Sequence, residues 1–368
     1  MTIETTTNRH FPTELQEQPE AIRRTDAYLA DVLDATFTRY LAGVDRIIWT
    51  GSGDCYFVGF AIASFFERIA GIPAVAIESY DFVSELPLLT PNTLVIGFSS
   101  SGKSIYAVEA LELAAERGAR TMAVTNTGVN RLAEVAAVSL TTQAGRSFSF
   151  PTKTSTTAML VGLRLAEFLA GVKPASAGEL ADHMIEALKS ATRDSPAVAG
   201  KISAARRVVV VGSGLGRAAA FIGAAKFIET AEIAASGNNA EEFLHLIGFG
   251  LQEVDAVVVI DDGNLRSRLA AQYAVQQGAH TVVITSDPEA DELPHEAARI
   301  VTPAGDPVLR VFGDIVALHA LAAAVSANRG TNPDIPAGVD LEYVIGLLYT
   351  GTVDGWNAEA AKGVITGA

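Results

Sequence analysis

The sequence predicts an α/β protein made of two copies of one parallel-sheet unit. Apolar runs rich in β-branched residues alternate with stretches of helical pattern and length, and this order occurs twice. Each copy also begins with a strand that ends in Gly-Ser-Gly. Continuous apolar strands separated by helices are typical of parallel sheets that helices cover on both faces.

The first copy follows a segment to about Gly43 that has a helical pattern. Its strands are predicted at 46–50, 74–77, 93–98 and 120–125. The first strand runs into Gly51-Ser52-Gly53 and a helix. The third runs into Ser99-Ser100-Ser101-Gly102-Lys103-Ser104, and a helix is expected over about 104–117.

The second copy repeats this order. Strands are predicted at 207–211, 256–260 and 281–285, with helices at 217–235 and 265–277. The first strand ends in Gly212-Ser213-Gly214, and the next ends in Asp261-Asp262-Gly263-Asn264. In both copies the second loop follows the Gly-Ser-Gly turn by about 48 residues, which indicates duplication of one unit.

The predicted organisation has five segments. They are an N-terminal helical segment (1–43), a first α/β domain (44–173), a helical linker (174–205), a second α/β domain (206–330) and a C-terminal tail (331–368). A chain of 368 residues is long enough for two domains of this size.

Composition excludes several classes of protein. Asp and Glu outnumber Lys and Arg by 42 to 27, and a net charge of −15 argues against binding to nucleic acid. Cys55 is the single cysteine, so the chain cannot form an internal disulfide or a zinc site of several cysteines. The first 25 residues lack the apolar core of a signal peptide, and no uninterrupted apolar run reaches about 18 residues. We therefore expect a cytoplasmic protein without membrane contact.

The two copies differ at the loop where a ligand is expected. Ligands of open α/β sheets bind at the carboxyl ends of the strands. Hydroxyls at a helix N-terminus suit a phosphate, whereas Asp261 and Asp262 at the equivalent place would repel it. The sequence therefore predicts one phosphate site, at residues 99–104. The alternative is that these serines only cap the following helix.

Two nucleotide motifs are also partly matched. Gly212-Ser213-Gly214-Leu215-Gly216 resembles a dinucleotide-binding turn, but its third glycine comes one residue early. Residues 97–104 satisfy the spacing of a P-loop, yet Gly97 and Phe98 have the pattern of a strand end. A nucleoside triphosphate site thus stays open as an alternative, and either form of the loop would hold phosphate.

A candidate acid–base pair lies in the second copy. Lys226 and Glu229 are three residues apart, so they share one face of a helix. Glu229 is a candidate general base, or half of an ordinary ion pair at or near the surface. His245 follows Glu241-Glu242-Phe243-Leu244 and is a candidate acid; the alternative is a histidine packed in the core.

This ordered set of motifs resembles the sugar isomerase (SIS) family in its tandem two-domain form, over nearly the whole chain. The relatives it resembles are the isomerase half of glutamine–fructose-6-phosphate aminotransferase and the galactosamine-6-phosphate deaminase/isomerases. The resemblance implies two three-layer α/β/α domains with mainly parallel sheets. The motifs that carry it are Gly51-Ser52-Gly53-Asp54-Cys55-Tyr56, the serine loop at 99–104, Pro151-Thr152-Lys153-Thr154, the helix bearing Lys226 and Glu229, and His245.

The resemblance also implies roles. Ser99, Ser101 and Ser104 would hold the phosphate, and Glu229 would move a proton between C1 and C2 of the sugar. His245, from the neighbouring subunit of a homodimer with a shared active site, would assist ring opening. No metal and no cofactor are implied. The implied substrate-binding residues are Gly53, Asp54, Cys55, Ser99, Ser100, Ser101, Ser104, Thr152 and Lys226.

Departures from the family leave the reaction open. The aminotransferase uses a lysine in its C-terminal tail, and here no lysine occurs between Lys226 and Lys362. Asp54-Cys55 replaces the usual Ser or Thr of the first turn. The main hypothesis is an aldose–ketose isomerase of a sugar phosphate or aminosugar phosphate, with or without loss of an amine. The alternatives are a fructosamine-6-phosphate deglycase and a non-catalytic sensor of sugar phosphates.

Overall fold

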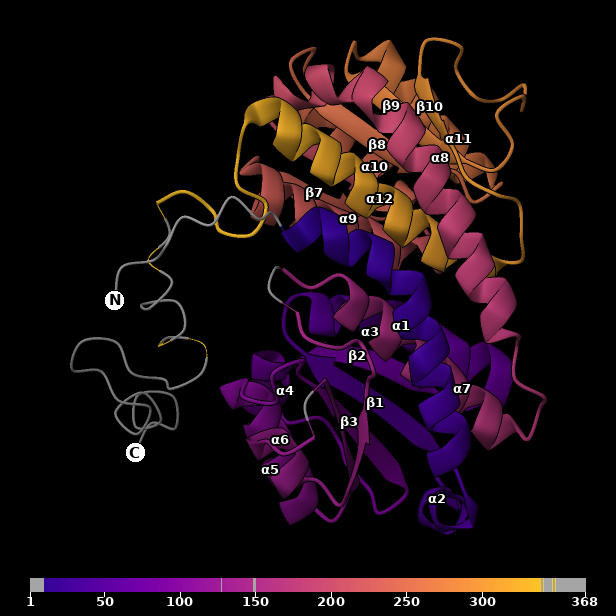
Figure 1. Ribbon diagram of the computed structural model, residues 1–368, viewed down its shortest axis with the longest axis vertical. Coiled ribbons are helices and arrows are strands. Elements are labelled where there is room, and N and C mark those ends of the chain that lie inside the picture. The colour runs from indigo at the N-terminus through magenta and orange to yellow at the C-terminus, as the bar shows by residue number, and fades with distance from the viewer. Residues whose placement is uncertain are drawn as a thin grey trace. The chain divides into compact units, whose positions relative to one another are not determined.

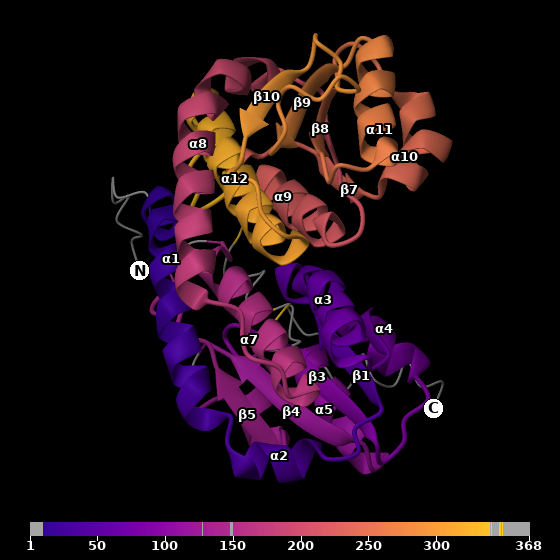
Figure 2. The ribbon, with the colours of Figure 1, turned by 90° about the vertical axis from the view of Figure 1, so that its right-hand side faces the viewer.

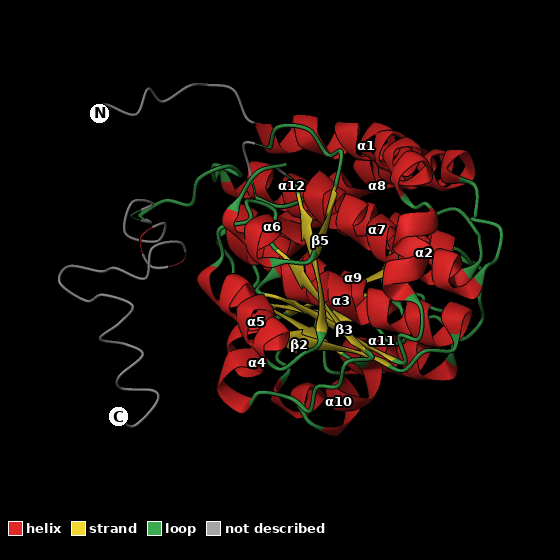
Figure 3. Cartoon of the chain, turned by 90° about the horizontal axis from the view of Figure 1, so that it is seen from below, coloured by secondary structure: helices red, strands yellow, loops and turns green. Residues whose placement is uncertain are grey.

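The computed structural model describes residues 10–126, 128–147, 150–338, 340, 346 and 348. Within them the chain forms two five-stranded sheets, each covered by helices on both faces (Figures 1, 2 and 3). This confirms the predicted α/β class with three layers in each copy, and the sheets are parallel throughout.

Contacts divide the chain into two compact units. Unit 1 holds the described parts of Met1–Arg24, Arg146–Thr156 and Ala175–Ala337, and unit 2 holds those of Thr25–Gly145, Thr157–Pro174 and Gly338–Ala368. Each unit contains one sheet. The predicted domain boundaries remain predictions, because these units combine parts of several predicted segments.

Unit 2 contains the first sheet, in the order β2-β1-β3-β4-β5. Ile48 and Val95 pack on one face against α4, α5 and α6, while Trp49 faces α3 on the other, where Gly59 lets the helix approach closely. The strands are β1 Arg46–Gly51, β2 Ala74–Glu78, β3 Thr93–Phe98, β4 Arg120–Thr125 and β5 Val138–Thr141. The helices are α2 Ala35–Leu41, α3 Asp54–Phe65 with its π-helical end Phe66–Ala70, α4 Ser79–Glu85, α5 Ile105–Glu116 and α6 Arg131–Val135. Helices α1 His10–Val32 and α7 Lys153–Ala170 contribute residues to both units.

Unit 1 contains the second sheet, in the order β10-β9-β8-β6-β7. Helices α8, α9 and α12 cover one face, and α10 and α11 cover the other (Figure 2). The strands are β6 Val208–Val211, β7 Ala235–Asn238, β8 Ala256–Ile260, β9 His280–Thr285 and β10 Ala298–Val301. The helices are α8 Ala177–Ser203, α9 Gly216–Ala231, α10 Ala240–His245, α11 Leu265–Gln276 and α12 Pro307–Arg329.

The two sheets share one strand order, as expected for two copies of one unit. When the five strands are numbered in chain order within each copy, both sheets have the order second, first, third, fourth, fifth. The glycines of the two loops match as well: Gly53 and Gly214 both have positive φ, as do Gly102 and Gly263. One local architecture was therefore kept in both copies while the residues around it changed.

One prediction of local structure was wrong. The helix expected over 217–235 ends at Ala231, where Glu232 adopts a left-handed conformation with φ of 52°. The chain then forms β7 at the edge of the sheet. Its Gly237 and Asn238 are residues with low strand propensity, so this strand depends on its pairing with β6.

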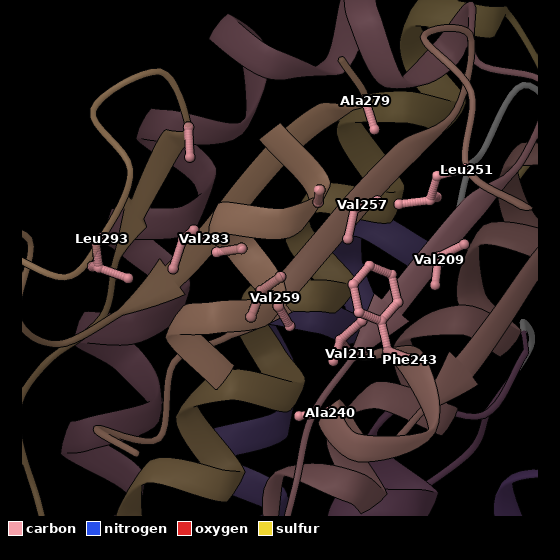
Figure 4. Packing of buried hydrophobic residues seen from close by; sticks show 14 residues of the cluster. Val209, Val211, Ala240, Phe243, Leu251, Val257, Val259, Ala279, Val283 and Leu293 are labelled. Carbon is pink, nitrogen blue, oxygen red and sulfur yellow. The ribbon is translucent and has the colours of Figure 1, made fainter. Parts of the chain in front are cut away.

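The core of unit 1 shows why apolar runs predicted this fold. Val209 and Val211 of β6 and Val257 and Val259 of β8 lie on the face that meets α10 and α11, where Phe243 packs against them (Figure 4). The alternate valines of the same strands are also fully buried, toward the opposite helices. Burial on both faces explains why these strands are apolar without alternation.

Helix α12 is an apolar core helix of unit 1. Among the described residues it alone is long and apolar enough to cross a membrane, but most of that stretch is buried in the protein, where it packs against α8 and α9. Its apolar composition is explained by this packing.

Candidate active site

The serine loop lies at the switch point of the unit 2 sheet. Strand order reverses between β1 and β3, and the crevice outside the carboxyl ends of such a strand pair is the usual ligand site of open α/β sheets. The turn from Gly51 to Asp54 follows β1, and Ser99 to Ser104 follow β3, so the two segments leave neighbouring strands. Unit 2 thus places two of the predicted binding segments at one edge of one sheet.

Strand β3 extends through Phe98, which leaves only residues 99–104 as a loop before α5. Gly97 lies in the strand and packs against Leu111 of α5. A P-loop needs its first glycine in the loop, so this geometry argues against the nucleoside triphosphate alternative.

The serines of this loop do not act as an ordinary helix cap. Ser104 is the N-cap residue of α5, yet its side chain makes no capping hydrogen bond. The Ser100 hydroxyl is buried and has no hydrogen-bond partner among the described residues. The amides of Lys103 and Ser104 donate long hydrogen bonds, of 3.3 and 3.5 Å, to the hydroxyls of Ser101 and Ser99. Amides held so loosely at a helix N-terminus are suited to an anion.

Gly102 gives the loop its sharp turn. Its φ is +66°, and a Cβ atom there would lie 2.0 Å from Oδ1 of Asn130. Asn130 in turn caps α6 and donates a hydrogen bond of 3.2 Å to the hydroxyl of Thr125, at the end of β4. Sequence reasoning missed this brace, because nothing in the motif shows which distant residue packs against its glycine.

The equivalent loop of unit 1 supplies its own anions. Asp261 accepts hydrogen bonds from the amide of Gly263 at 3.0 Å and the hydroxyl of Thr285 at 2.8 Å. Asp262 accepts one from the amide of Asn264 at 3.0 Å. The pKa of the nearby Asp314 is raised to about 7, chiefly by burial; the charge of Arg310 lowers it, and the charges of Asp261 and Asp262 raise it. Asp261 also pairs with Arg268, at 3.2 Å. The loop's own carboxylates occupy the amides of Gly263 and Asn264, so this loop is unsuited to phosphate.

The first turn of unit 2 places Asp54 at the start of α3. Gly53 has a φ of +58° and is the N-cap residue, and Asp54 is buried as the first residue of the helix. An acidic side chain is favourable at that position because of the helix dipole. Cys55 is half-buried, and its carbonyl accepts a hydrogen bond of 2.7 Å from the indole of Trp49.

Thr152 lies in unit 1, just before α7. Its side chain is fully buried, and the hydroxyl has no hydrogen-bond partner among the described residues. The next residue, Lys153, pairs with Glu17 of α1 and donates a hydrogen bond of 2.8 Å to the carbonyl of Arg146. The local packing therefore does not use the Thr152 hydroxyl.

Helix α9 holds Lys226 and Glu229 as a close ion pair. The side chain of Lys226 is 0% exposed, while that of Glu229 is 24% exposed. Glu229 lies thirteen residues after Gly216, the first residue of α9, which at 1.5 Å per residue is about 20 Å. Glu229 therefore lies far from the loops that follow β6 and β8, at the opposite edge of its own sheet. The buried ammonium of Lys226 therefore faces a carboxylate that is partly open to solvent.

His245 is the last residue of α10 and is a surface residue. Its side chain is 76% exposed, and Nε2 lies 3.3 Å from Oε1 of Glu241, which also pairs with Arg266. The alternative of a histidine packed in the core is therefore wrong. Helices α9 and α10 lie on opposite faces of the sheet of unit 1, so this unit by itself does not bring His245 and Glu229 together (Figure 2).

The fold and the loops define a class: a duplicated α/β protein with a hydroxyl-lined anion loop in one copy only. The SIS domain model matches residues 40–167 and 201–325, one match in each copy. The chain therefore belongs to the SIS domain family, and it carries two SIS domains.

Curated relatives are similar over most of the chain. It is 27% identical over 337 residues to a glutamine–fructose-6-phosphate aminotransferase (isomerizing) of Thermococcus kodakarensis, covering 88% of this chain and 56% of the relative. It is 28% identical over 352 residues to the enzyme of that name from Gloeobacter violaceus, covering 89% of this chain and 57% of the relative. The chain thus spans little more than half the length of these relatives, in agreement with the predicted resemblance to one part of them.

Solved structures share the fold. The C-terminal domain of the glucosamine-fructose-6-phosphate aminotransferase from Francisella tularensis has a TM-score of 0.81 at 18% identity, covering 91% of this chain and all of that one. The tagatose-6-phosphate ketose/aldose isomerase from Escherichia coli has a TM-score of 0.77 at 23% identity, covering 92% and 98%. These likenesses show that this chain shares its fold with both proteins.

Proposed function

We propose that this protein is an aldose–ketose isomerase of a sugar phosphate or aminosugar phosphate. The observation that carries the proposal is the contrast between the two loops. The serine loop offers neutral hydroxyls and loosely held amides at a helix N-terminus, whereas carboxylates fill its counterpart. Ser99, Ser100, Ser101 and Ser104 bind the phosphate in this account, and the turn from Gly53 to Cys55 faces the sugar.

In the proposed reaction, Glu229 moves a proton between C1 and C2. The carboxylate accepts the proton from one carbon, the C–H electron pair passes into an enediol or enolamine, and the proton returns to the neighbouring carbon. Lys226 pairs with this carboxylate, and the ionised carboxylate is the form that can accept a proton. The buried hydroxyl of Thr152 is assigned to the substrate as well. No cofactor and no metal enter this scheme.

His245 acts, in this proposal, in the active site of a second copy of the chain. The residues around it support a contact with another protein surface. Leu246, Phe249 and Leu265 are exposed apolar side chains next to it in sequence or on the packed helix α11, and Phe249 is 75% exposed. Exposed apolar residues that cluster are typical of interfaces. A homodimer would cover them and deliver His245 to the partner's Glu229, where it assists ring opening.

Complementation tests the shared site. Glu229→Gln and His245→Asn are each expected to be inactive as homodimers. Subunits mixed and re-associated should regain about a quarter of wild-type activity, because half of the dimers are mixed and each of these holds one intact site. Activity that stays absent, although differently tagged subunits are shown to have mixed, would mean that each chain uses its own histidine or none.

A fructosamine-6-phosphate deglycase is the second candidate. Asp54 favours it, since a buried carboxylate beside the phosphate loop suits an amine better than the hydroxyl residue that the family usually has there. The absence of the lysine that the aminotransferase uses also favours a deglycase. The stretch of chain from 227 to 361 has none, and Lys362 and most of the tail after Gly338 lie outside the described residues.

A substrate panel separates these functions. Purified protein is incubated in D₂O with fructose 6-phosphate, glucosamine 6-phosphate and a fructosamine 6-phosphate. Deuterium at C1 or C2 without amine release identifies an isomerase, which is the expected result. Released amine identifies a deaminase or deglycase. Tight binding with neither event identifies a sensor and removes the catalytic proposal.

We place the enzyme in the cytoplasm as part of the same proposal.

A further inference from the structure

Two tyrosines meet at the carboxyl edge of the unit 2 sheet. Tyr80 and Tyr106 are the second residues of α4 and α5, the helices that follow β2 and β3. These two strands flank β1 in the sheet. The rings meet edge-on, with 4.9 Å between their centres. Helical side chains lean toward the N-terminus of their helix, so the two rings lie toward the edge that carries the serine loop.

A carboxylate without a cationic partner lies next to these rings. Glu78 ends β2, and its carboxylate accepts hydrogen bonds from the amide of Tyr80 at 2.6 Å and from the hydroxyl of Ser52, in the turn after β1, at 2.5 Å. Within the described part of the chain, no lysine, arginine or histidine pairs with it. Burial raises the pKa of the Tyr106 phenol, and the Tyr80 ring and the carboxylates of Glu109 and Glu78 raise it further. The surroundings of the rings therefore favour a positive charge.

Both rings keep surface that a ligand can reach. Tyr80 is 38% exposed, and Tyr106 is half-buried. Among the residues that the structure describes, no lysine or arginine lies over either ring. Aromatic faces attract cations, and clustered aromatic rings are used to recognise ammonium groups of ligands. The tyrosine pair and Glu78 thus have the chemistry of an ammonium site.

We propose that Tyr80 and Tyr106 are specificity-determining residues, whose rings bind a cationic amine that the substrate carries in addition to its phosphate. This inference rests on the proposed function and narrows its substrate to an aminosugar phosphate with a protonated nitrogen. Ser104, the N-cap residue of α5, lies two residues before Tyr106, so one helix N-terminus carries both the proposed phosphate contacts and a ring. Glu78 adds the negative charge. A neutral sugar phosphate would make the phosphate contacts without those of the amine.

Two unreactive ligands test this site. Glucitol 6-phosphate and 2-amino-2-deoxyglucitol 6-phosphate differ only at C2, and neither has the carbonyl that isomerisation needs. Titration calorimetry at neutral pH should show that the wild-type protein binds the amine at least about tenfold more tightly, since two rings and a carboxylate each favour it. This preference should fall as the pH rises and the ammonium of the ligand loses its proton.

Substitutions assign the preference to these residues. Tyr80→Leu and Tyr106→Leu should each lower it about threefold or more, while the dissociation constant of glucitol 6-phosphate stays within about twofold. Tyr80→Phe and Tyr106→Phe keep the rings and should retain most of the preference. Glu78→Gln keeps the acceptor that caps α4 but loses the charge, and should lower the preference as well. Glu85→Gln is the matched control, because Glu85 is exposed at the other end of α4, and it should bind both ligands as wild type does.

The outcomes separate this inference from the proposed function. Equal binding of the two ligands by the wild-type protein overturns the inference alone, as does an unchanged preference in the folded leucine variants. If a leucine variant does not fold, an unchanged preference in Glu78→Gln overturns it instead. If neither ligand binds, the unit 2 edge is not a sugar-phosphate site, and the proposed function fails together with the inference.

Discussion

Glu229→Gln is expected to lower kcat at least about 100-fold, roughly 2.7 kcal/mol in the barrier, while substrate binding changes little. The amide has the same shape as the carboxylate and can accept a hydrogen bond from Lys226, so the buried ammonium keeps a partner and the helix keeps its packing. Only the ability to take a proton is lost. The measurements are kcat for isomerisation and the dissociation constant of the sugar phosphate.

Glu289→Gln is the control, because Glu289 is an exposed glutamate in unit 1. It should leave both constants unchanged. Activity of Glu229→Gln within about tenfold of wild type, about 1.4 kcal/mol in the barrier, would remove this carboxylate from the mechanism.

Ser99→Ala/Ser101→Ala is expected to raise KM at least about 100-fold with a much smaller change in kcat. Each hydroxyl offers a hydrogen bond to a charged phosphate, and such bonds contribute about 1.5–3 kcal/mol each. The loop backbone should persist, because Gly102, Asn130 and the first turn of α5 hold it without these hydroxyls. KM for the sugar phosphate, compared with binding of inorganic phosphate, measures the effect.

The control carries two serine-to-alanine changes elsewhere in unit 2. Ser84 of α4 and Ser139 of β5 are both exposed, and Ser84→Ala/Ser139→Ala should bind substrate as wild type does. An unchanged KM in the Ser99/Ser101 variant would show that the phosphate binds elsewhere.

The fold could be predicted because strands that are buried on both faces have continuous apolar sequences. Runs such as Val208–Val211 and Ala256–Ile260 are buried on both faces and so lack polar residues. The edge strands β5, β7 and β10 escaped prediction, since each has four residues and includes polar ones such as Ser139 or Asn238. Their strand form comes from pairing with a neighbour, which local sequence does not record.

The site could be predicted only where its chemistry is local. The serine loop and the Lys226–Glu229 spacing are visible in short segments, and the structure shows the loop at a sheet switch point and the pair in contact. The brace by Asn130 and the pairing of Tyr80 with Tyr106 depend on contacts between residues far apart in the chain. The exposure of His245 likewise follows from the place of α10 in the fold.

The most direct test is a crystal structure of the Glu229→Gln variant with a bound sugar phosphate. We expect the phosphate at the N-terminus of α5, contacting Ser99, Ser101 and Ser104, and the side chain of residue 229 within hydrogen-bond distance of C1 or C2 or their oxygens. A phosphate bound away from residues 99–104, or a sugar whose C1 and C2 lie beyond the reach of residue 229 in every subunit of the assembly, would contradict the account.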